Sequence, residues 1–293
     1  MQRPLWKCLI IGWLLALGSL LCGCGAVRFA YGQGPELAYW WLDGYADFNE
    51  TQTPRAREAI EGWFRWHRAT QLPDYAQFLV RLQAQATEPI TPAQVCRLYD
   101  ETASRSEAMI ERALPAAVDT VQSLTLQQIA HIERKYAKVN AEFRNDYLHS
   151  DPELRLSKSV ERAQERAEMI YGNLSEAQHE QLVRAIAASP FDPQLWLAER
   201  MQRQQDTLKT LRRLVTEHAS ADQTLAALRV LVQQVQRSPR EPYVAYQARL
   251  QQYNCRLTAE LHNSTSREQR AAAVKKLKSW EEDARALAAD SIK

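Results

Sequence analysis

Apolar residues recur at intervals of three and four along most of the chain, which is the spacing of one face of an α-helix. In the segments LAYWWLDGYADF (37–48) and PRAREAIEGWFRWHRAT (54–70), aromatic residues occupy these positions, and Pro54 suits a first helical turn. The pattern predicts helices over 37–48, 54–70, 73–87, 92–122, 126–148, 152–171, 176–188, 193–218, 221–237, 242–263 and 267–289.

Glycine usage indicates the fold class. Eight of the nine glycines lie at or before Gly62, so residues 63–293 contain only Gly172. Strand-rich and βα folds need glycine in their turns and loops, whereas this chain marks its late breaks with prolines near 189–193 and 238–242. These breaks are too short for flexible linkers. We therefore expect an all-α fold, a multi-helix bundle of roughly ten helices that forms a single body with no β-sheet.

Four predicted helices begin with similar short phrases: ITPAQ (90–94), LTLQQ (124–128), LSEAQ (174–178) and TSREQ (265–269). In each phrase a hydroxyl oxygen can accept from the backbone N–H three residues later while a glutamine side chain reaches back, which is a capping box. The phrases recur at unequal intervals, so they do not indicate a solenoid. The expected capping residues are Thr91, Gln94, Thr125, Gln128, Ser175, Gln178, Ser266 and Gln269.

The first residues have the features of a secretory signal. Arg3 and Lys7 precede a largely apolar run over 8–22, which is shorter than the 18 or more residues of a spanning helix. The run ends in Leu-Cys-Gly-Cys (21–24), which resembles the bacterial lipobox. The resemblance implies cleavage before Cys24 and attachment of acyl chains, such as palmitate, at that cysteine. Cleavage after Ala26 and an uncleaved anchor are the alternatives.

The predicted organisation has three parts: a lipoprotein signal peptide over 1–23, a short tether over 24–35, and an all-helical periplasmic domain over 36–293. The lipobox resemblance also implies a destination, since an aspartate directly after the cysteine is the signal for the inner membrane. Here Gly25 follows Cys24. We therefore expect a lipid-anchored protein on the periplasmic face of the outer membrane rather than the inner membrane.

Net charge argues against a nucleic-acid partner. The sequence has 37 Lys plus Arg and 35 Asp plus Glu, and the difference of two equals Arg3 plus Lys7. The chain after residue 23 is therefore formally neutral. A neutral chain with mixed charges lacks the basic footprint of nucleic-acid binding, and most of its charges are expected on solvated helix faces.

Two cysteines, Cys96 and Cys255, lie within the expected periplasmic domain. In an oxidising compartment an even pair of cysteines favours a disulfide. Such a bridge closes a loop of about 160 residues, worth roughly 5 kcal/mol in the chain-entropy description. The alternative is two buried free thiols in separate places.

No motif in the sequence supplies a catalytic, cofactor or metal site. None of the histidines belongs to an HExxH motif, and CxxC, GxSxG, P-loop and dinucleotide-binding patterns are absent. Asp43 and Asp47 lie one helical turn apart and could form an acid pair or hold a cation, although a solvated helix face is the favoured interpretation. His67, near two tryptophans, is expected to be a packed or hydrogen-bonded residue rather than a ligand.

Aromatic residues are dense near the start of the expected domain. This segment could lie on a membrane or form an apolar groove, because Trp and Tyr favour the headgroup zone. It lacks the Lys/Arg-rich polar face of typical surface-lying helices, so core packing is favoured over membrane contact, and both remain open. The residues concerned are Phe29, Tyr31, Tyr39, Trp40, Trp41, Tyr45, Phe48, Trp63, Phe64 and Trp66.

Two resemblances to known proteins bear on function. The capping phrases resemble the LTxxQ motif of small all-helical periplasmic proteins related to the chaperone Spy, where the motif also marks helix starts. A wider resemblance, to a proteobacterial lipoprotein family of unassigned function, extends over the chain after residue 23. It implies an all-α, envelope-anchored protein and supplies no catalytic residue. The segments that carry it are GCGAVRFAY, LAYWWLDGYADF, QTPRAREAI, WHRATQLPDYA, SPFDPQLWLAERMQRQQD and YNCRLTAELHNSTSREQR.

These observations favour a membrane-anchored envelope lipoprotein of unknown molecular function that is not an enzyme. The first hypothesis is a binding or chaperone-like module in the periplasm, held to the membrane through the lipid on Cys24. The second is a structural scaffold associated with peptidoglycan or another envelope protein. A hydrolase ranks last, because no motif supplies its catalytic groups. No cofactor, metal or nucleic-acid partner is expected.

Overall fold

The computed structural model describes residues 26–290, of which 85% are helical, with no β-strand in this range. Taking α4, η1 and α5 as the one continuous helix they form, this part of the chain has 11 helices in a single all-α body. The elements are α2 (Ala26–Gly32), α3 (Gly34–Ala46), α4 (Gln52–Trp66), the π-helical turn η1 (His67–Gln71), α5 (Leu72–Gln85), α6 (Pro92–Gln122), α7 (Leu126–Tyr147), α8 (Pro152–Tyr171), α9 (Glu176–Ala187), α10 (Pro193–Thr216), α11 (Ala221–Gln236), α12 (Glu241–Asn263) and α13 (Arg267–Ala289).

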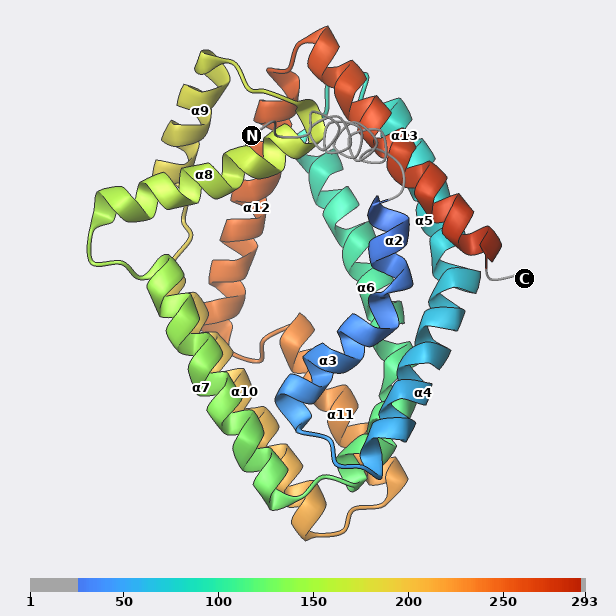
Figure 1. Ribbon diagram of the computed structural model, residues 1–293. Helices are drawn as coiled ribbons and strands as arrows, with labels where there is room; N and C mark the ends of the chain where they lie inside the picture. The colour runs from blue at the N-terminus through green and yellow to red at the C-terminus, as the bar shows by residue number, and fades with distance from the viewer. Residues whose placement is uncertain (1–25, 291–293) are drawn as a thin grey trace, which may run out of the picture.

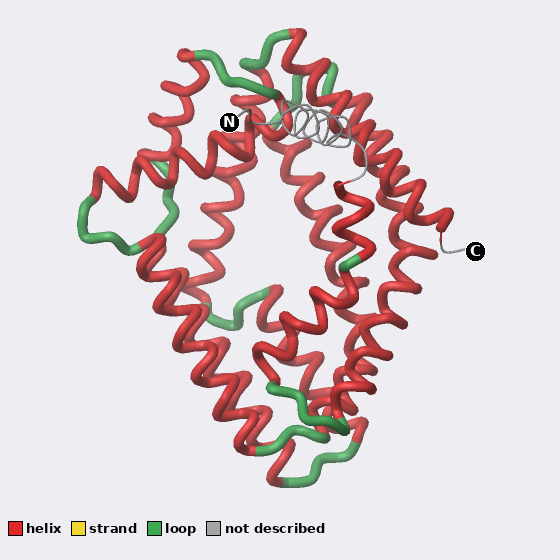
Figure 2. Tube along the Cα trace, viewed as in Figure 1, coloured by secondary structure: helices red, strands yellow, loops and turns green. Residues whose placement is uncertain are grey.

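The helices are arranged along the sides of an elongated frame rather than around one central core (Figure 1). Helices α7 and α10 pack side by side along one edge, and α5 and α13 pack along the opposite edge. The green connections in Figure 2 are short and lie mostly at the corners of the frame, where consecutive helices change direction. Short connections fix the angles between neighbouring helices, which favours one rigid body.

Helix α6 links the two edges of the frame. It packs on α12 and on α11, and it also contacts α10 and α4. The sulfur atoms of Cys96 in α6 and Cys255 in α12 are bonded at 2.09 Å, and their Cα atoms are 5.4 Å apart. The disulfide expected as one alternative from the sequence is therefore present between these two helices.

The main buried apolar cluster lies where α6 ends, α7 begins and α10 passes beside them. Because the side chains in this cluster come from three helices, burial of its apolar surface holds one end of the frame together. Ile129 of α7 is fully buried within it. The buried members are Val121, Leu124, Ile129, Ile132, Leu208, Leu211 and Leu214.

The sequence predicts two separate helices over 54–70 and 73–87, whereas the structure has one continuous helix from Gln52 to Gln85. Pro73 has no backbone N–H and its ring crowds the preceding turn, which normally ends or kinks a helix. Here the chain widens into the π-helical turn η1, and the N–H of Leu72 donates to the carbonyl of His67, five residues back. The wider turn accommodates the proline without a break.

Residues 26–32, which belong to the expected tether, form helix α2. This helix contacts α13, and Arg28 pairs with Asp283 at 2.9 Å. The helical body therefore begins two residues after Cys24 in the sequence. The signal peptide and Cys24 lie outside the described residues. No described helix combines the length and the apolar character needed to cross a membrane.

Candidate functional site

The hydroxyl–glutamine pairs expected at the starts of four helices form capping boxes in the structure. Thr91, Thr125, Ser175 and Ser266 each accept from the backbone N–H of the glutamine three residues later. Each glutamine side chain in turn accepts from the backbone N–H of its capping residue. A fifth box, formed by Ser220 and Gln223, opens α11 and was not expected from the sequence.

Two of these capping glutamines also pair with each other. The side-chain amides of Gln178 and Gln269 exchange hydrogen bonds of 2.9 Å in both directions. Gln178 Nε2 donates to the carbonyl of Ser264, and Gln269 Nε2 donates to the carbonyl of Asn173. The starts of α9 and α13 are therefore tied to each other through the same side chains that cap them.

The same arrangement ties α4 to α7. Gln52 and Gln128 exchange side-chain hydrogen bonds of 3.3 and 2.7 Å, and their Nε2 atoms donate to the carbonyls of Ser123 and Asp47, respectively. Just before α4, the Asn49 side chain accepts from the N–H of Gln52 at 3.0 Å, and Gln52 Oε1 accepts from the N–H of Asn49 at 3.1 Å. The hydroxyl–glutamine pattern does not reveal this pair, because an asparagine stands where the other four phrases have a hydroxyl residue.

These glutamine pairs are structural. Each amide already donates to and accepts from neighbouring helices, and Gln52, Gln128 and Gln178 are buried. They have no free hydrogen-bonding capacity to offer a ligand. These glutamines are therefore not candidates for ligand binding.

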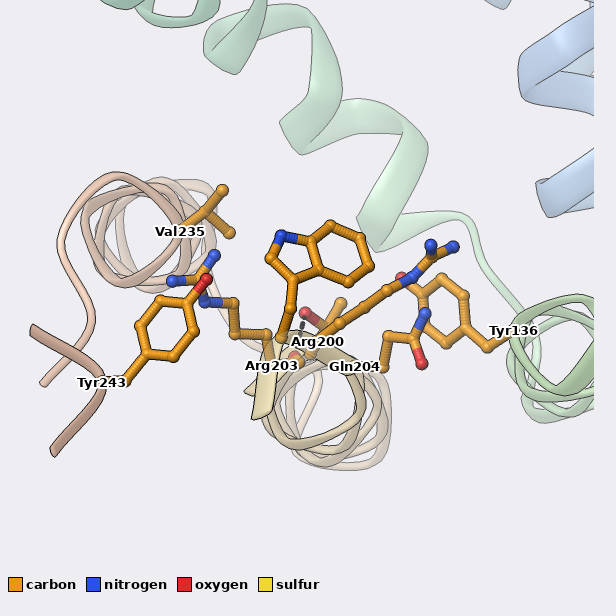
Figure 3. Close-up of a pocket in the computed structure, with 8 residues that line it drawn as sticks. Tyr136, Arg200, Arg203, Gln204, Val235 and Tyr243 are labelled. Carbon is orange, nitrogen blue, oxygen red and sulfur yellow. Dashed lines mark hydrogen bonds between the residues drawn. The ribbon is translucent and has the colours of Figure 1, made fainter. Parts of the chain in front are cut away.

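A hollow of about 310 Å³ lies between α7, α10, α11 and α12 (Figure 3). Most of its wall comes from one face of α10, where lining residues recur at helical spacing from Trp196 to Thr207. That spacing was the only signal in the sequence that could have pointed to this site. The lining residues are Tyr136, Trp196, Arg200, Arg203, Gln204, Thr207, Val235 and Tyr243.

Aromatic rings and guanidinium groups alternate across this hollow. Arg200 extends toward Tyr136 and Arg203 toward Tyr243, on opposite sides of α10 (Figure 3). Arg203 lies 5.2 Å from the centroid of the Tyr243 ring, and Arg200 lies 5.5 Å from that of Trp196. Both distances suit a cation–π contact.

The two arginines differ in how they are held. Arg203 Nε donates to Glu199 at 2.8 Å. The Glu199 side chain is only 3% exposed, and it also accepts a hydrogen bond from Arg240 at 3.0 Å. Nη2 of Arg203 is nevertheless buried without a hydrogen-bond partner among the described residues. No carboxylate of the described chain lies within ion-pair distance of Arg200, which contacts the Trp196 ring and lies near the Tyr136 phenol.

The remaining polar groups of the hollow are either hydrogen-bond donors or already hydrogen-bonded within the protein. Gln204 and Asn140 exchange hydrogen bonds of 2.7 and 3.3 Å, and the Thr207 hydroxyl donates to the carbonyl of Arg203. Burial raises the pKa of the Tyr136 phenol above its ordinary value, and it does the same for Tyr243. Both phenols therefore stay protonated at neutral pH and can donate.

A second hollow, of about 680 Å³, lies between α8 and α9 and has an acidic wall. It is lined by four glutamates, and His179 there contacts Gln164 at 2.9 Å. Within residues 26–290, no group of three or more His, Cys, Asp or Glu side chains is placed to hold a metal ion.

The other residues singled out in the sequence do not form a joint site. Asp43 accepts from the backbone N–H of Phe48 at 2.9 Å, next to the end of α3, while Asp47 lies 4.0 Å from His131. His67 contacts the Tyr31 hydroxyl at 2.7 Å and stacks on a tryptophan ring, so it is a packed and hydrogen-bonded residue.

The aromatic segment divides between core and surface. Tyr39 is buried, and Phe48, Trp63, Phe64 and Trp66 are partly buried. Core packing, the favoured interpretation, is wrong for Phe29, Trp40 and Trp41, which are 73%, 74% and 61% exposed. Helices α2 and α3 pack on the body with one face, and no other described helix packs against the opposite face.

Comparison with known proteins gives a family but no activity. No match was found among curated proteins, and none among solved structures. One family matches over residues 44–236, which extends from the end of α3 through α11 and includes most of the lining of the hollow on α7, α10 and α11. The chain belongs to this family, described as a family of unknown function (DUF6279).

Proposed function

We propose that this chain is a non-enzymatic binding protein of the bacterial cell envelope, tethered by lipid on Cys24, whose α7–α10–α11–α12 hollow takes an anionic ligand. The observation that carries the proposal is the buried Nη2 of Arg203, which has no partner among the described residues. A buried donor without a partner is costly, at about 1–3 kcal/mol, and a ligand oxygen would relieve that cost.

The chemistry of the hollow favours an anion with a planar or apolar body. Two guanidinium groups and two phenols are available as donors, whereas the amide and hydroxyl of Gln204 and Thr207 are occupied within the protein. Guanidinium groups bind carboxylate and phosphate oxygens through charge-assisted hydrogen bonds. The rings of Trp196 and Tyr243 supply flat walls against which such a body can pack.

Binding rather than catalysis fits the ionisable groups of the hollow. Proton transfer near neutral pH needs a group whose pKa lies near 7. Burial moves the phenol pKa values of Tyr136 and Tyr243 upward, away from neutral pH. None of these side chains supplies a general base at neutral pH.

The proposed location rests on the lipobox resemblance of residues 21–24 and on the absence of aspartate after Cys24. In this proposed location, the protein is anchored by lipid to the outer membrane and faces the periplasm. The disulfide between Cys96 and Cys255 suits an oxidising compartment. A chaperone-like role and a scaffold role differ in the ligand: the first predicts binding of unfolded polypeptide, the second binding to isolated peptidoglycan.

The test uses 1-anilinonaphthalene-8-sulfonate, an aromatic anion whose fluorescence rises in apolar surroundings. We expect saturable binding to the full chain that is weakened about tenfold by Arg200→Gln, because the charge-assisted bond is lost. Arg213→Gln is the matched control, since this residue lies on the same helix and pairs with Glu217 on the surface. Benzoate should displace the dye, and benzylammonium should not.

Two results would contradict the proposal. The first is equal dye affinity for the Arg200→Gln and Arg213→Gln variants. The second is displacement by benzylammonium as effective as displacement by benzoate, since a cation of the same size and shape should not compete for a guanidinium site.

A further inference from the structure

Exposed large apolar side chains are concentrated on α2 and α3. Leu37, Trp40 and Trp41 lie at positions i, i+3 and i+4 of α3 and therefore share one face. They are 57%, 74% and 61% exposed, and Phe29 on α2 is 73% exposed. We call Phe29, Leu37, Trp40 and Trp41 the aromatic face. An exposed group of side chains of this size and kind marks an interaction surface in soluble proteins.

The aromatic face is held in a fixed orientation on the body. On the opposite side of α3, Tyr39 is buried and its hydroxyl lies 3.1 Å from Thr53 Oγ1, while Ala46 is also buried. Helix α3 packs on both α4 and α7, and Trp41 contacts the ring of Tyr45 at 5.0 Å. The exposed side chains therefore point in a direction that the body determines.

The charges of Glu36 and Arg28, which lie beside the aromatic face, are each paired within the protein. Glu36 forms an ion pair with Arg57, whose guanidinium lies 3.8 Å from the centroid of the Tyr39 ring. Arg28 pairs with Asp283. The nearby Lys135 of α7 lies over the Tyr45 ring at 5.4 Å. A ligand of the aromatic face must therefore be recognised by apolar contact, since opposite charge contributes little.

We propose that the aromatic face inserts into the headgroup region of the membrane to which the chain is tethered. The inference rests on the proposed tether at Cys24, because Phe29 follows that residue by five positions and Trp41 by 17, so the lipid holds this face within reach of the bilayer. Tryptophan and phenylalanine favour the boundary between headgroups and acyl chains. A lipid surface is thus the occupant that both the position and the chemistry of the face indicate.

The proposed contact has a distinct electrostatic signature. Typical surface-lying helices carry many lysines and arginines and bind anionic lipids in a salt-sensitive manner. The aromatic face itself carries no charge, and Glu36 and Arg28 beside it are paired, so its insertion should be nearly equal in zwitterionic and anionic bilayers and should resist high salt. Its effect is to orient the body, because the acyl chains already supply the attachment.

The experiment uses the full-length protein, purified in detergent and reconstituted into phosphatidylcholine vesicles with brominated acyl chains, which quench nearby tryptophans. Trp40 and Trp41 are two of the six tryptophans after Cys24, so we expect the lipid to quench roughly a third of the total emission of these six. The Trp40→Ser/Trp41→Ser variant should lose this part, while Trp280→Ser on α13 should keep it. Any tryptophan before Cys24 contributes equally to all three proteins.

Three controls make the outcome decisive. Helical circular dichroism verifies that the exposed substitutions leave the fold intact, and 0.5 M NaCl or added phosphatidylglycerol should not change the quenching. Flotation with vesicles reports the tether separately, so a failed tether appears as loss of flotation by all three proteins. Equal quenching of the wild type and the Trp40→Ser/Trp41→Ser variant, or no quenching of the wild type, would overturn the inference.

Discussion

At the scale of single residues, glutamine at the third helical position has two roles in this protein. Gln223 only caps its own helix, whereas Gln128 caps α7 and also donates to the carbonyls of Ala46 and Asp47 and to Gln52. A capping hydrogen bond on the surface contributes about 1 kcal/mol or less, whereas a buried carbonyl left without its donor costs about 1–3 kcal/mol.

Replacing these glutamines by alanine separates the two roles. We expect Gln128→Ala to lower the free energy of unfolding by about 3 kcal/mol, because buried groups of α3 and α4 lose their donor. Gln223→Ala should lower it by about 1 kcal/mol or less, because only the cap is lost. Urea denaturation followed by circular dichroism measures both, and equal losses would show that the pairing between helices adds no stability.

A second residue-scale prediction concerns pH. Burial lowers the pKa of His67 below its ordinary value near 6.5, so the unfolded chain binds a proton that the folded chain does not. Stability is then complete above pH 6.5 and falls as the pH decreases through the lowered pKa. When the pH is lowered from 7.5 to 5.5, the urea midpoint of unfolding should decrease more in the wild type than in His67→Gln. The exposed His149→Gln substitution should match the wild type, and an unchanged pH dependence in His67→Gln would contradict the prediction.

At the scale of elements, the disulfide between α6 and α12 is the one covalent link across the described body. It joins residues 159 positions apart, and in the chain-entropy description such a loop contributes roughly 5 kcal/mol to the free energy of unfolding. We expect Cys96→Ser/Cys255→Ser to lose up to that amount and to become insensitive to dithiothreitol. Peptide mapping that finds Cys96 and Cys255 as free thiols in the native, unreduced protein would contradict this account.

Helix boundaries were predictable because local signals set them. Pro92 and Pro193 at first-turn positions and the hydroxyl–glutamine caps act within a few residues, so sequence alone placed those helix starts correctly. The continuous helix through Pro73 was missed, since a π-helical turn that accommodates a proline has no sequence signal of its own. The pairing of Gln52 with Gln128 depends on contacts 76 residues apart, which no local pattern reports.

At the scale of the whole molecule, the candidate site was the least predictable feature. The hollow combines one face of α10 with single residues from α7, α11 and α12, so its composition depends on how the frame closes. The exposure of Trp40 and Trp41 likewise depends on which face of α3 meets α4 and α7. Amphipathic spacing predicts that a helix has an apolar face, but the same spacing describes a buried face and a membrane-facing one.

The central claim is that this helical body works at a membrane surface to which Cys24 attaches it. The most direct test is intact-mass and N-terminal peptide mass spectrometry of the protein purified from a bacterial host that expresses the full sequence. The account predicts a chain that begins at Cys24 and carries a diacylglyceryl group with its acyl chains. A predominant species that retains residues 1–23 and carries no lipid would contradict it.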